Sequence, residues 1–132
     1  DILGMKFHEF EKLVVEAIKQ LPAEIRAKMD NVAIVIEDWP NAHQFRKGGV
    51  RSGDLLLGLY EGIPRTARGG NYSGVLPDKI SIFKNSIEAV ARTPEAIKEQ
   101  VQETVWHEIA HHFGIDETRV RQLSRKRKNR TA

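Results

Sequence analysis

The sequence contains no cysteine, and this absence restricts both its structure and its chemistry. It can form no disulfide framework, it offers no thiolate nucleophile, and it cannot hold zinc through cysteine ligands. Any bound metal ion must therefore be held by histidine, aspartate or glutamate side chains.

Long apolar runs are also absent, since no segment approaches the ~18 uninterrupted apolar residues of a membrane-spanning helix. The N-terminal stretch mixes charged residues such as Lys6, Glu9 and Lys12 with its apolar ones, which excludes the apolar core of a secretory signal. We therefore expect a soluble, cytoplasmic protein without a membrane segment.

Acidic residues are missing from the C-terminal end, which carries seven basic residues after Thr118. The preceding 117 residues contain 14 basic and 18 acidic side chains, so the net charge of +3 arises from the tail alone. We expect residues 125–132 to form a solvated, disordered basic tail, with contact to nucleic acid or to an acidic partner as the alternative.

With 132 residues, 40% of them apolar, the chain is long enough for one domain with a core and too short for two. We interpret residues 1–132 as a single domain. Hydrophobic periodicity and turn residues predict helices at 6–20, 23–29, 86–91, 94–113 and 116–126, and strands at 32–36, 55–60 and 79–83. This pattern indicates an α+β fold, in which helices flank a small mixed sheet of three to four strands.

Several local expectations accompany this fold. The apolar run at 32–36 is typical of a strand covered on both faces, and the dozen or so residues after Pro40 are expected to form a loop. The glycine-rich stretch 61–77 is too long for a plain connection and is expected to line a site. Trp39 and Trp106 are expected in or near the core.

The helix at 94–113 has strong boundary signals. Thr93 supplies a hydroxyl for the N-cap, Pro94 suits the first helical position, and Gly114 suits the left-handed residue that ends a helix. His107 and His111 lie four residues apart on it, so they share one face, where two imidazoles can bind one cation. Glu108 lies one residue further round, where its carboxylate can take a proton from a water on the metal.

A catalytic zinc ion needs a third protein ligand and an open position. No histidine, aspartate or glutamate follows Glu117, so no later helix can supply that ligand. A turn at Gly114 would let Glu117 return to the metal, and Asp116 is the alternative. His112 lies about 100° round the helix from His111 and is interpreted as a supporting or core residue rather than a ligand.

An oxyanion formed during hydrolysis would need a further hydrogen-bond donor. Tyr72, in the glycine-rich stretch, is the preferred candidate, with Arg68 and Arg119 as alternatives.

The chain resembles the small bacterial zincin-like minimal metalloprotease family, whose pattern is His-Glu-x-x-His-x-x-Gly-x-x-Asp. The resemblance covers Leu21-Pro22, 31–38 with Pro40, 57–64, 76–83 and the segment 107–117. It implies a compact zincin-like α+β fold, with Glu117 in the place of the usual aspartate. Metzincin proteases have a turn with a methionine after the motif. The only methionines here, Met5 and Met29, precede the motif, so membership of the metzincins is not expected.

Together these observations predict a zinc-dependent metallopeptidase that binds one zinc ion and hydrolyses a peptide or protein substrate. His107, His111 and Glu117 are the expected metal ligands, Glu108 the general base and Tyr72 the oxyanion donor. The alternative hypothesis is a catalytically weak or inactive zincin-like protein that binds nucleic acid or an acidic partner through its basic tail.

Overall fold

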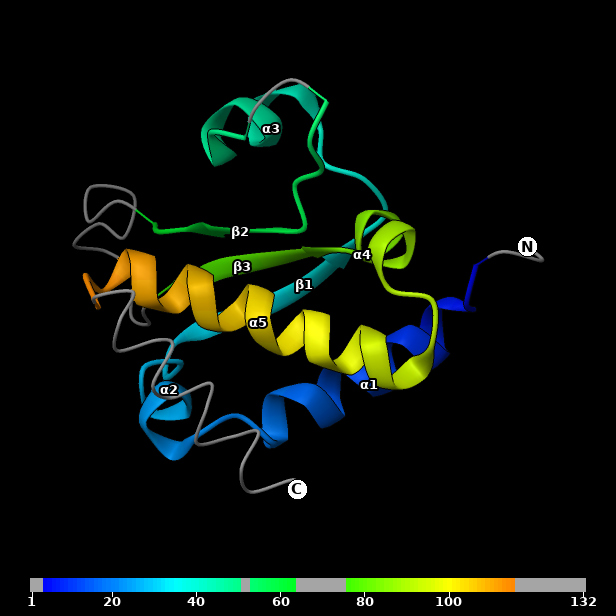
Figure 1. Ribbon diagram of the computed structural model, residues 1–132. Coiled ribbons are helices and arrows are strands. Elements are labelled where there is room, and N and C mark those ends of the chain that lie inside the picture. The colour runs from blue at the N-terminus through cyan, green and yellow to red at the C-terminus, as the bar shows by residue number, and fades with distance from the viewer. Residues whose placement is uncertain (1–3, 51–52, 64–75, 116–132) are drawn as a thin grey trace.

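The computed structural model describes residues 4–50, 53–63 and 76–115. In these residues the chain forms α1 (Phe7–Lys19), α2 (Ala23–Ala27), β1 (Val32–Glu37), α3 (Ala42–Gly48), β2 (Gly58–Glu61), β3 (Asp78–Phe83), α4 (Lys84–Val90) and α5 (Pro94–His112). Figure 1 shows α1, α2 and α5 on one face of the sheet and α3 on the other. The predicted α+β fold is confirmed.

The described sheet has three strands in the order β1-β3-β2. β1 runs parallel to β3, and β2 runs antiparallel to it, so the sheet is mixed, as expected. The expectation that residues 32–36 are covered on both faces is wrong, because β1 is an edge strand and is half-exposed along its whole length. β3 occupies the centre instead, and its last four residues are buried.

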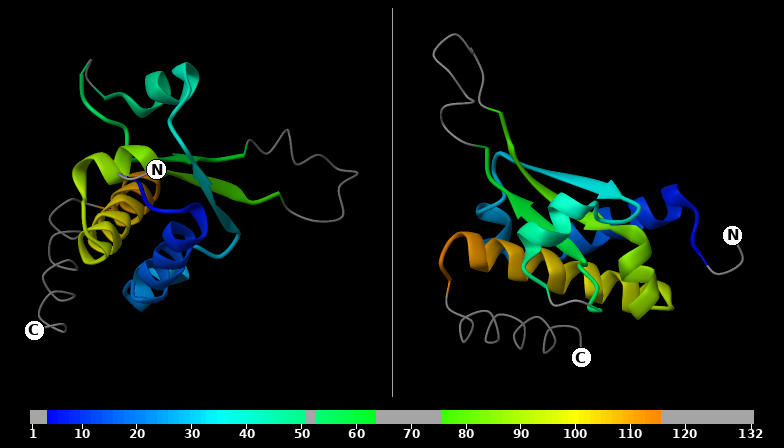
Figure 2. Two further views of the ribbon diagram at one scale, coloured as in Figure 1. Left: turned by 90° about the vertical axis from the view of Figure 1, so that its right-hand side faces the viewer. Right: turned by 90° about the horizontal axis from the view of Figure 1, so that it is seen from above.

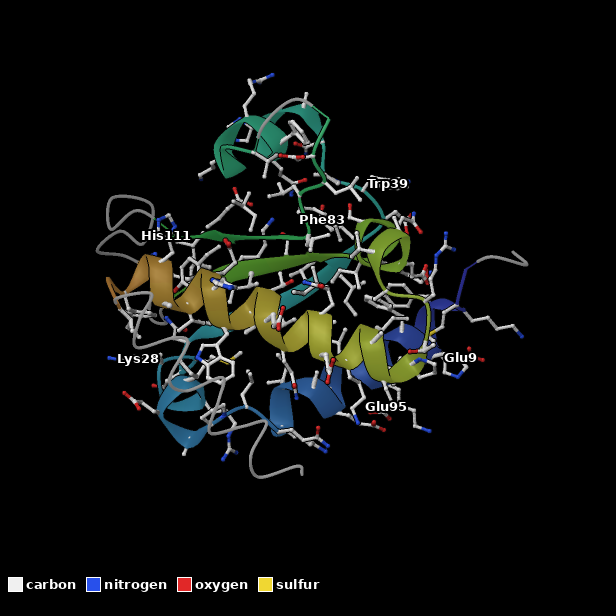
Figure 3. The ribbon with its side chains drawn as sticks, in the orientation of Figure 1. Glu9, Lys28, Trp39, Phe83, Glu95 and His111 are labelled. Carbon is white, nitrogen blue, oxygen red and sulfur yellow. The ribbon has the colours of Figure 1, made fainter. Side chains whose placement is uncertain are left out.

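The main core lies between the sheet and the helices α1 and α5, which run side by side (Figure 2). The apolar stripe of α1 is buried through Phe10, Val14 and Ala17, as its periodicity predicted. Trp106 of α5 is also buried, but the expectation for Trp39 is wrong. Its side chain, just after β1, is 54% exposed, and Figure 3 shows it at the surface.

A second, smaller hydrophobic cluster joins α3 to the other face of the sheet. It contains Leu56, Leu59 and Phe83, with Phe45 and Val50 packed against them. The two clusters therefore lie on opposite faces of the sheet. No helix in the described part of the chain is long and apolar enough to cross a membrane.

The loop expected after Pro40 is instead largely helical, because α3 begins at Ala42. The Asn41 side chain accepts a hydrogen bond from the Gln44 amide at 2.8 Å, and the Gln44 side chain accepts one from the Asn41 amide at 2.9 Å. Gly49, with φ of +68°, closes the helix. Asn41 and Gly49, which lie in the expected loop, therefore cap a helix of two turns.

The ends of α5 agree with the prediction to within one residue. The Thr93 hydroxyl accepts a hydrogen bond from the Ala96 amide, and Pro94 is the first helical residue. Gly114 has φ of +68°, and the Ile115 amide donates to the Ala110 carbonyl at 2.7 Å, which satisfies one of the last free carbonyls. The other predicted elements that the structure describes are present, with ends shifted by up to three residues. The predicted helix 116–126 and most of the stretch 61–77 lie outside the described residues.

Helix α5 lies unusually close to β2, and contacts repeat along the two elements. Thr104 lies against Gly58, Glu108 against Tyr60, and His112 against Gly62. Four helical residues advance about 6 Å and two strand residues about 6.6 Å, so the two elements stay in step. Glycine is required at the first contact, because a Cβ on Gly58 would lie 2.5 Å from the Thr104 methyl carbon.

We expect Gly58→Ala to lower the free energy of unfolding by about 1–3 kcal/mol, the usual cost of overpacking. The new methyl group would collide with Thr104 and would also lie 3.0 Å from the Ser81 carbonyl oxygen. Gly62→Ala is the matched control, because its Cβ would meet the His112 ring at an ordinary 3.5 Å. Urea denaturation of both variants measures the difference, and equal stabilities would show that the contact at Gly58 is not tight.

Candidate active site

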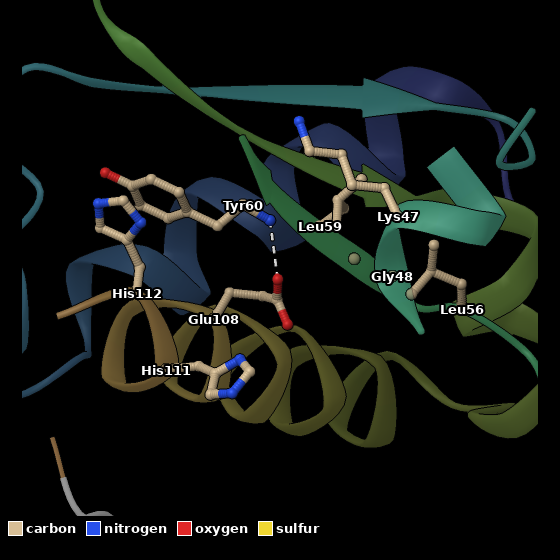
Figure 4. A pocket seen from close by; sticks show the side chains of 9 residues that line it. Lys47, Gly48, Leu56, Leu59, Tyr60, Glu108, His111 and His112 are labelled. Atoms are coloured by element: carbon tan, nitrogen blue, oxygen red, sulfur yellow. Dashed lines mark hydrogen bonds between the residues drawn. The ribbon is translucent and has the colours of Figure 1, made fainter. Parts of the chain in front are cut away.

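Glu108 is bonded to the backbone of the strand that it faces. Its Oε1 accepts a hydrogen bond from the Tyr60 amide at 2.7 Å (Figure 4). The Phe83 amide donates to the Leu57 carbonyl, so Leu57 directs its backbone groups toward β3. Because this direction alternates along an antiparallel strand, Tyr60, three residues later, directs its amide away from β3. The helix thus supplies the partner that this outer edge of the sheet lacks, and fixes one oxygen of the carboxylate.

His107 and His111 lie one turn apart on α5, and both are exposed. Glu108 between them is half-buried. Both imidazoles are close enough to Glu108 for their charges to influence its carboxyl group. The structure therefore places two exposed imidazole side chains beside one oriented carboxylate.

His112 takes part in a separate cluster at the end of α5. Its ring stacks on Tyr60, with the centroids 3.8 Å apart and the planes 17° from parallel. The Tyr60 hydroxyl donates to Asp78 Oδ2 at 2.6 Å, and the Ile63 amide donates to Oδ1 at 2.9 Å. This cluster joins the last turn of α5 to the end of β2 and the start of β3.

A cleft of about 200 Å³ opens beside Glu108 along the outer edge of β2. It is lined by Lys47, Gly48, Leu56, Gly58, Leu59, Tyr60, Glu108, His111 and His112. In Figure 4 the α3 side of the cleft lies across β2 from Glu108 and His111. The carboxylate and one of the two imidazoles therefore line the same cavity.

Residues 29–127 match the zincin-like metallopeptidase family. The chain belongs to this family. The solved structure of a conserved hypothetical protein from Thermus thermophilus is similar, with 22% identity and a TM-score of 0.53 over 83% of this chain and 94% of that one. At that identity the similarity concerns the fold alone. Among curated proteins no match was found.

The zincin-like domain brings together three of the predicted site residues, His107, Glu108 and His111. The expected third ligand Glu117 and its alternative Asp116 lie outside the described residues, as do Tyr72, Arg68 and Arg119. In the ranges 4–50, 53–63 and 76–115, no group of three histidine, aspartate or glutamate side chains could hold a metal ion. The assignments of Glu117 and Tyr72 therefore stay predictions.

The sequence interpretation did not single out Tyr60 and Asp78, although both contribute to the site of this zincin-like domain. Tyr60 holds Glu108 through its backbone, and its side chain links Asp78 to His112. Neither residue has a motif spacing to the histidines, because the contacts depend on how β2 and β3 pair. The signals in the sequence were their positions, at the end of the predicted strand 55–60 and immediately before the predicted strand 79–83, and their place in the segments 57–64 and 76–83 that carry the family resemblance.

The pKa of the Glu108 carboxyl is raised above its ordinary value, chiefly because burial disfavours the charged form. The hydrogen bond from the Tyr60 amide and the charges of His111 and His107 lower the pKa, but burial outweighs them. The folded zinc-free chain therefore binds the Glu108 proton more tightly than the unfolded chain does. The contribution of Glu108 to the free energy of unfolding therefore falls as the pH rises from the ordinary glutamate pKa through the raised one.

We expect the zinc-free Glu108→Gln variant to gain stability relative to the wild type as the pH is raised from acidic to neutral. Glutamine carries no charge at either pH, yet its side-chain oxygen can still accept the Tyr60 amide. Urea denaturation at a series of pH values measures the difference. The exposed Glu99 supplies the control Glu99→Gln. A difference between Glu108→Gln and wild type that is constant with pH would contradict the raised pKa.

Proposed function

We propose that this protein is a zinc-dependent peptidase in which Glu108 is the general base. The observation that carries the proposal is the hydrogen bond between Glu108 Oε1 and the Tyr60 amide, beside His111 and on the wall of a cleft. In the described part of the chain, no residue forms a hydrogen bond with Oε2. One oxygen is therefore held while the other can accept a proton from an attacking water.

The donor set fits zinc, because imidazole nitrogens are common zinc ligands and both histidines are exposed on one helical face. His107 and His111 would hold the ion, with Glu117 as the proposed third ligand and Asp116 as its alternative. When bound, a zinc ion lowers the pKa of a water molecule and polarises the substrate carbonyl.

The residues of the chain supply the remaining steps. Glu108 takes the proton of the attacking water and returns it to the departing amine. Its half-buried position raises its pKa, which makes it a stronger base than an exposed glutamate. Tyr72 is proposed as the donor to the oxyanion. The proposed substrate is a peptide, because the chain belongs to the zincin-like metallopeptidase family and the cleft beside Glu108 offers a peptide a place to bind.

We expect Glu108→Gln to lower peptide hydrolysis by at least about 10²-fold, the usual contribution of a general base, while zinc stays bound. Turnover of a quenched fluorescent peptide library measures the loss, and Glu99→Gln on the same helix should retain wild-type turnover. Activity of Glu108→Gln at the wild-type level would exclude Glu108 as the base.

We expect His107→Ala, His111→Ala and Glu117→Ala to lose bound zinc because each lacks one proposed ligand, whereas Asp116→Ala and His112→Ala retain it. Elemental analysis of protein purified without chelator measures the zinc content, and circular dichroism checks that each variant is folded. Loss of zinc in Asp116→Ala but not in Glu117→Ala would identify Asp116 as the third ligand. A wild-type protein without zinc would exclude the zinc assignment.

A further inference from the structure

We propose that the cleft beside Glu108 selects peptides with an acidic side chain, and that Lys47 recognises the carboxylate. Lys47 is in the last turn of α3, across the cleft from the residues of α5. Hydrolysis of such a peptide rests on the proposed function, whereas binding of the peptide does not.

The two charged side chains that line the cleft come from different walls, Lys47 from α3 and Glu108 from α5. Nine residues line the cleft. They include one lysine, Lys47, and one carboxylic acid, Glu108, and the other seven are histidines or uncharged residues. One oxygen of Glu108 already accepts the Tyr60 amide. A ligand that lies along β2 therefore meets a cation on the α3 wall.

Glu61 positions Lys47 without neutralising its surroundings. Lys47 Nζ lies 3.4 Å from Glu61 Oε2, and Lys79 Nζ lies 3.7 Å from Glu61 Oε1. One carboxylate is thus shared by two ammonium groups, which leaves this group of three with a net charge of +1. The Lys47 side chain is 47% exposed, and its ammonium has three N–H donors, so it can bind a second carboxylate.

The cleft lining beside Lys47 is apolar and closely packed. Leu56 and Leu59 are buried, and a Cβ on Gly48 would lie 2.6 Å from Leu56 Cδ1. The end of α3 is therefore fixed against Leu56, next to the lysine. An apolar lining next to an ammonium group suits a glutamate side chain, whose methylene groups can lie against the lining while its carboxylate reaches Lys47.

A free C-terminal carboxylate offers the same chemistry as a glutamate side chain, so the test must separate the two sources. The probes are fluorescent, alanine-based octapeptides with an amidated C-terminus and a single glutamate, glutamine or lysine before one leucine. A further glutamine peptide carries a free C-terminus. Fluorescence anisotropy at low ionic strength measures their binding to the zinc-free full chain, so that binding is measured without turnover.

We expect the amidated glutamate peptide to bind about three- to fivefold more tightly than the amidated glutamine peptide, as for one partly exposed ion pair. The lysine peptide should bind most weakly. Lys47→Met should abolish the preference, Lys47→Glu should reverse it, and Lys47→Arg should retain it. Lys12→Met changes the net charge equally but on the exposed face of α1, and should leave the preference unchanged.

Three outcomes would overturn the proposal. These are no measurable binding of the glutamate peptide, equal binding of the two amidated peptides, and a preference that survives Lys47→Met. Tighter binding of the free-terminus peptide than of the amidated glutamate peptide would also overturn it, because the recognised group would then be the C-terminus. A Lys47-dependent preference without hydrolysis of any peptide by the zinc-loaded chain would contradict the proposed function alone.

Discussion

The absence of a side chain at Gly58 lets α5 pack directly against β2, and the site takes its geometry from this contact. Once Thr104 lies against Gly58, the regular advance of helix and strand brings Glu108 to the Tyr60 amide and His112 to the Tyr60 ring. The positions of His107 and His111 follow, because they share the helix with Glu108. A single close approach of two elements thus orients the carboxylate and places both histidines beside it.

The same contact satisfies a requirement of the sheet. An edge strand leaves backbone donors without a partner in the sheet, and such edges invite pairing with other chains. In β2 a carboxylate from the helix accepts the Tyr60 amide. This carboxylate is half-buried, and burial disfavours its charge by more than the amide and the histidines favour it. Glu108 is therefore held in place but kept basic, a combination that acid–base catalysis requires.

Sequence interpretation succeeded where structure depends on neighbouring residues. The ends of α5 were predicted because Thr93, Pro94 and Gly114 act within a turn of the residues they cap. The spacing of His107 and His111 followed from the helix alone.

Features that depend on distant parts of the chain were not predicted. The apolar run of β1 resembles that of a central strand, yet the order of strands places β3 in the middle. Tyr60, Asp78 and His112 are far apart in sequence, and only the pairing of β2 with β3 and the packing of α5 bring them together. α3 was missed for a different reason, since Asn41 and Gly49 suit loops and helix caps equally.

The cleft is bounded by parts of the protein that belong to different hydrophobic clusters. The α5 wall rests on the main core, whereas Leu56 and Leu59, beside Lys47, belong to the small cluster with Phe83 on the opposite face of the sheet. Substitutions in the small cluster can therefore reshape the α3 wall while the packing that holds Glu108 and the histidines is preserved. Under the proposed function, recognition at Lys47 and chemistry at Glu108 would be separable, so specificity could diverge on one wall while the other stays constant.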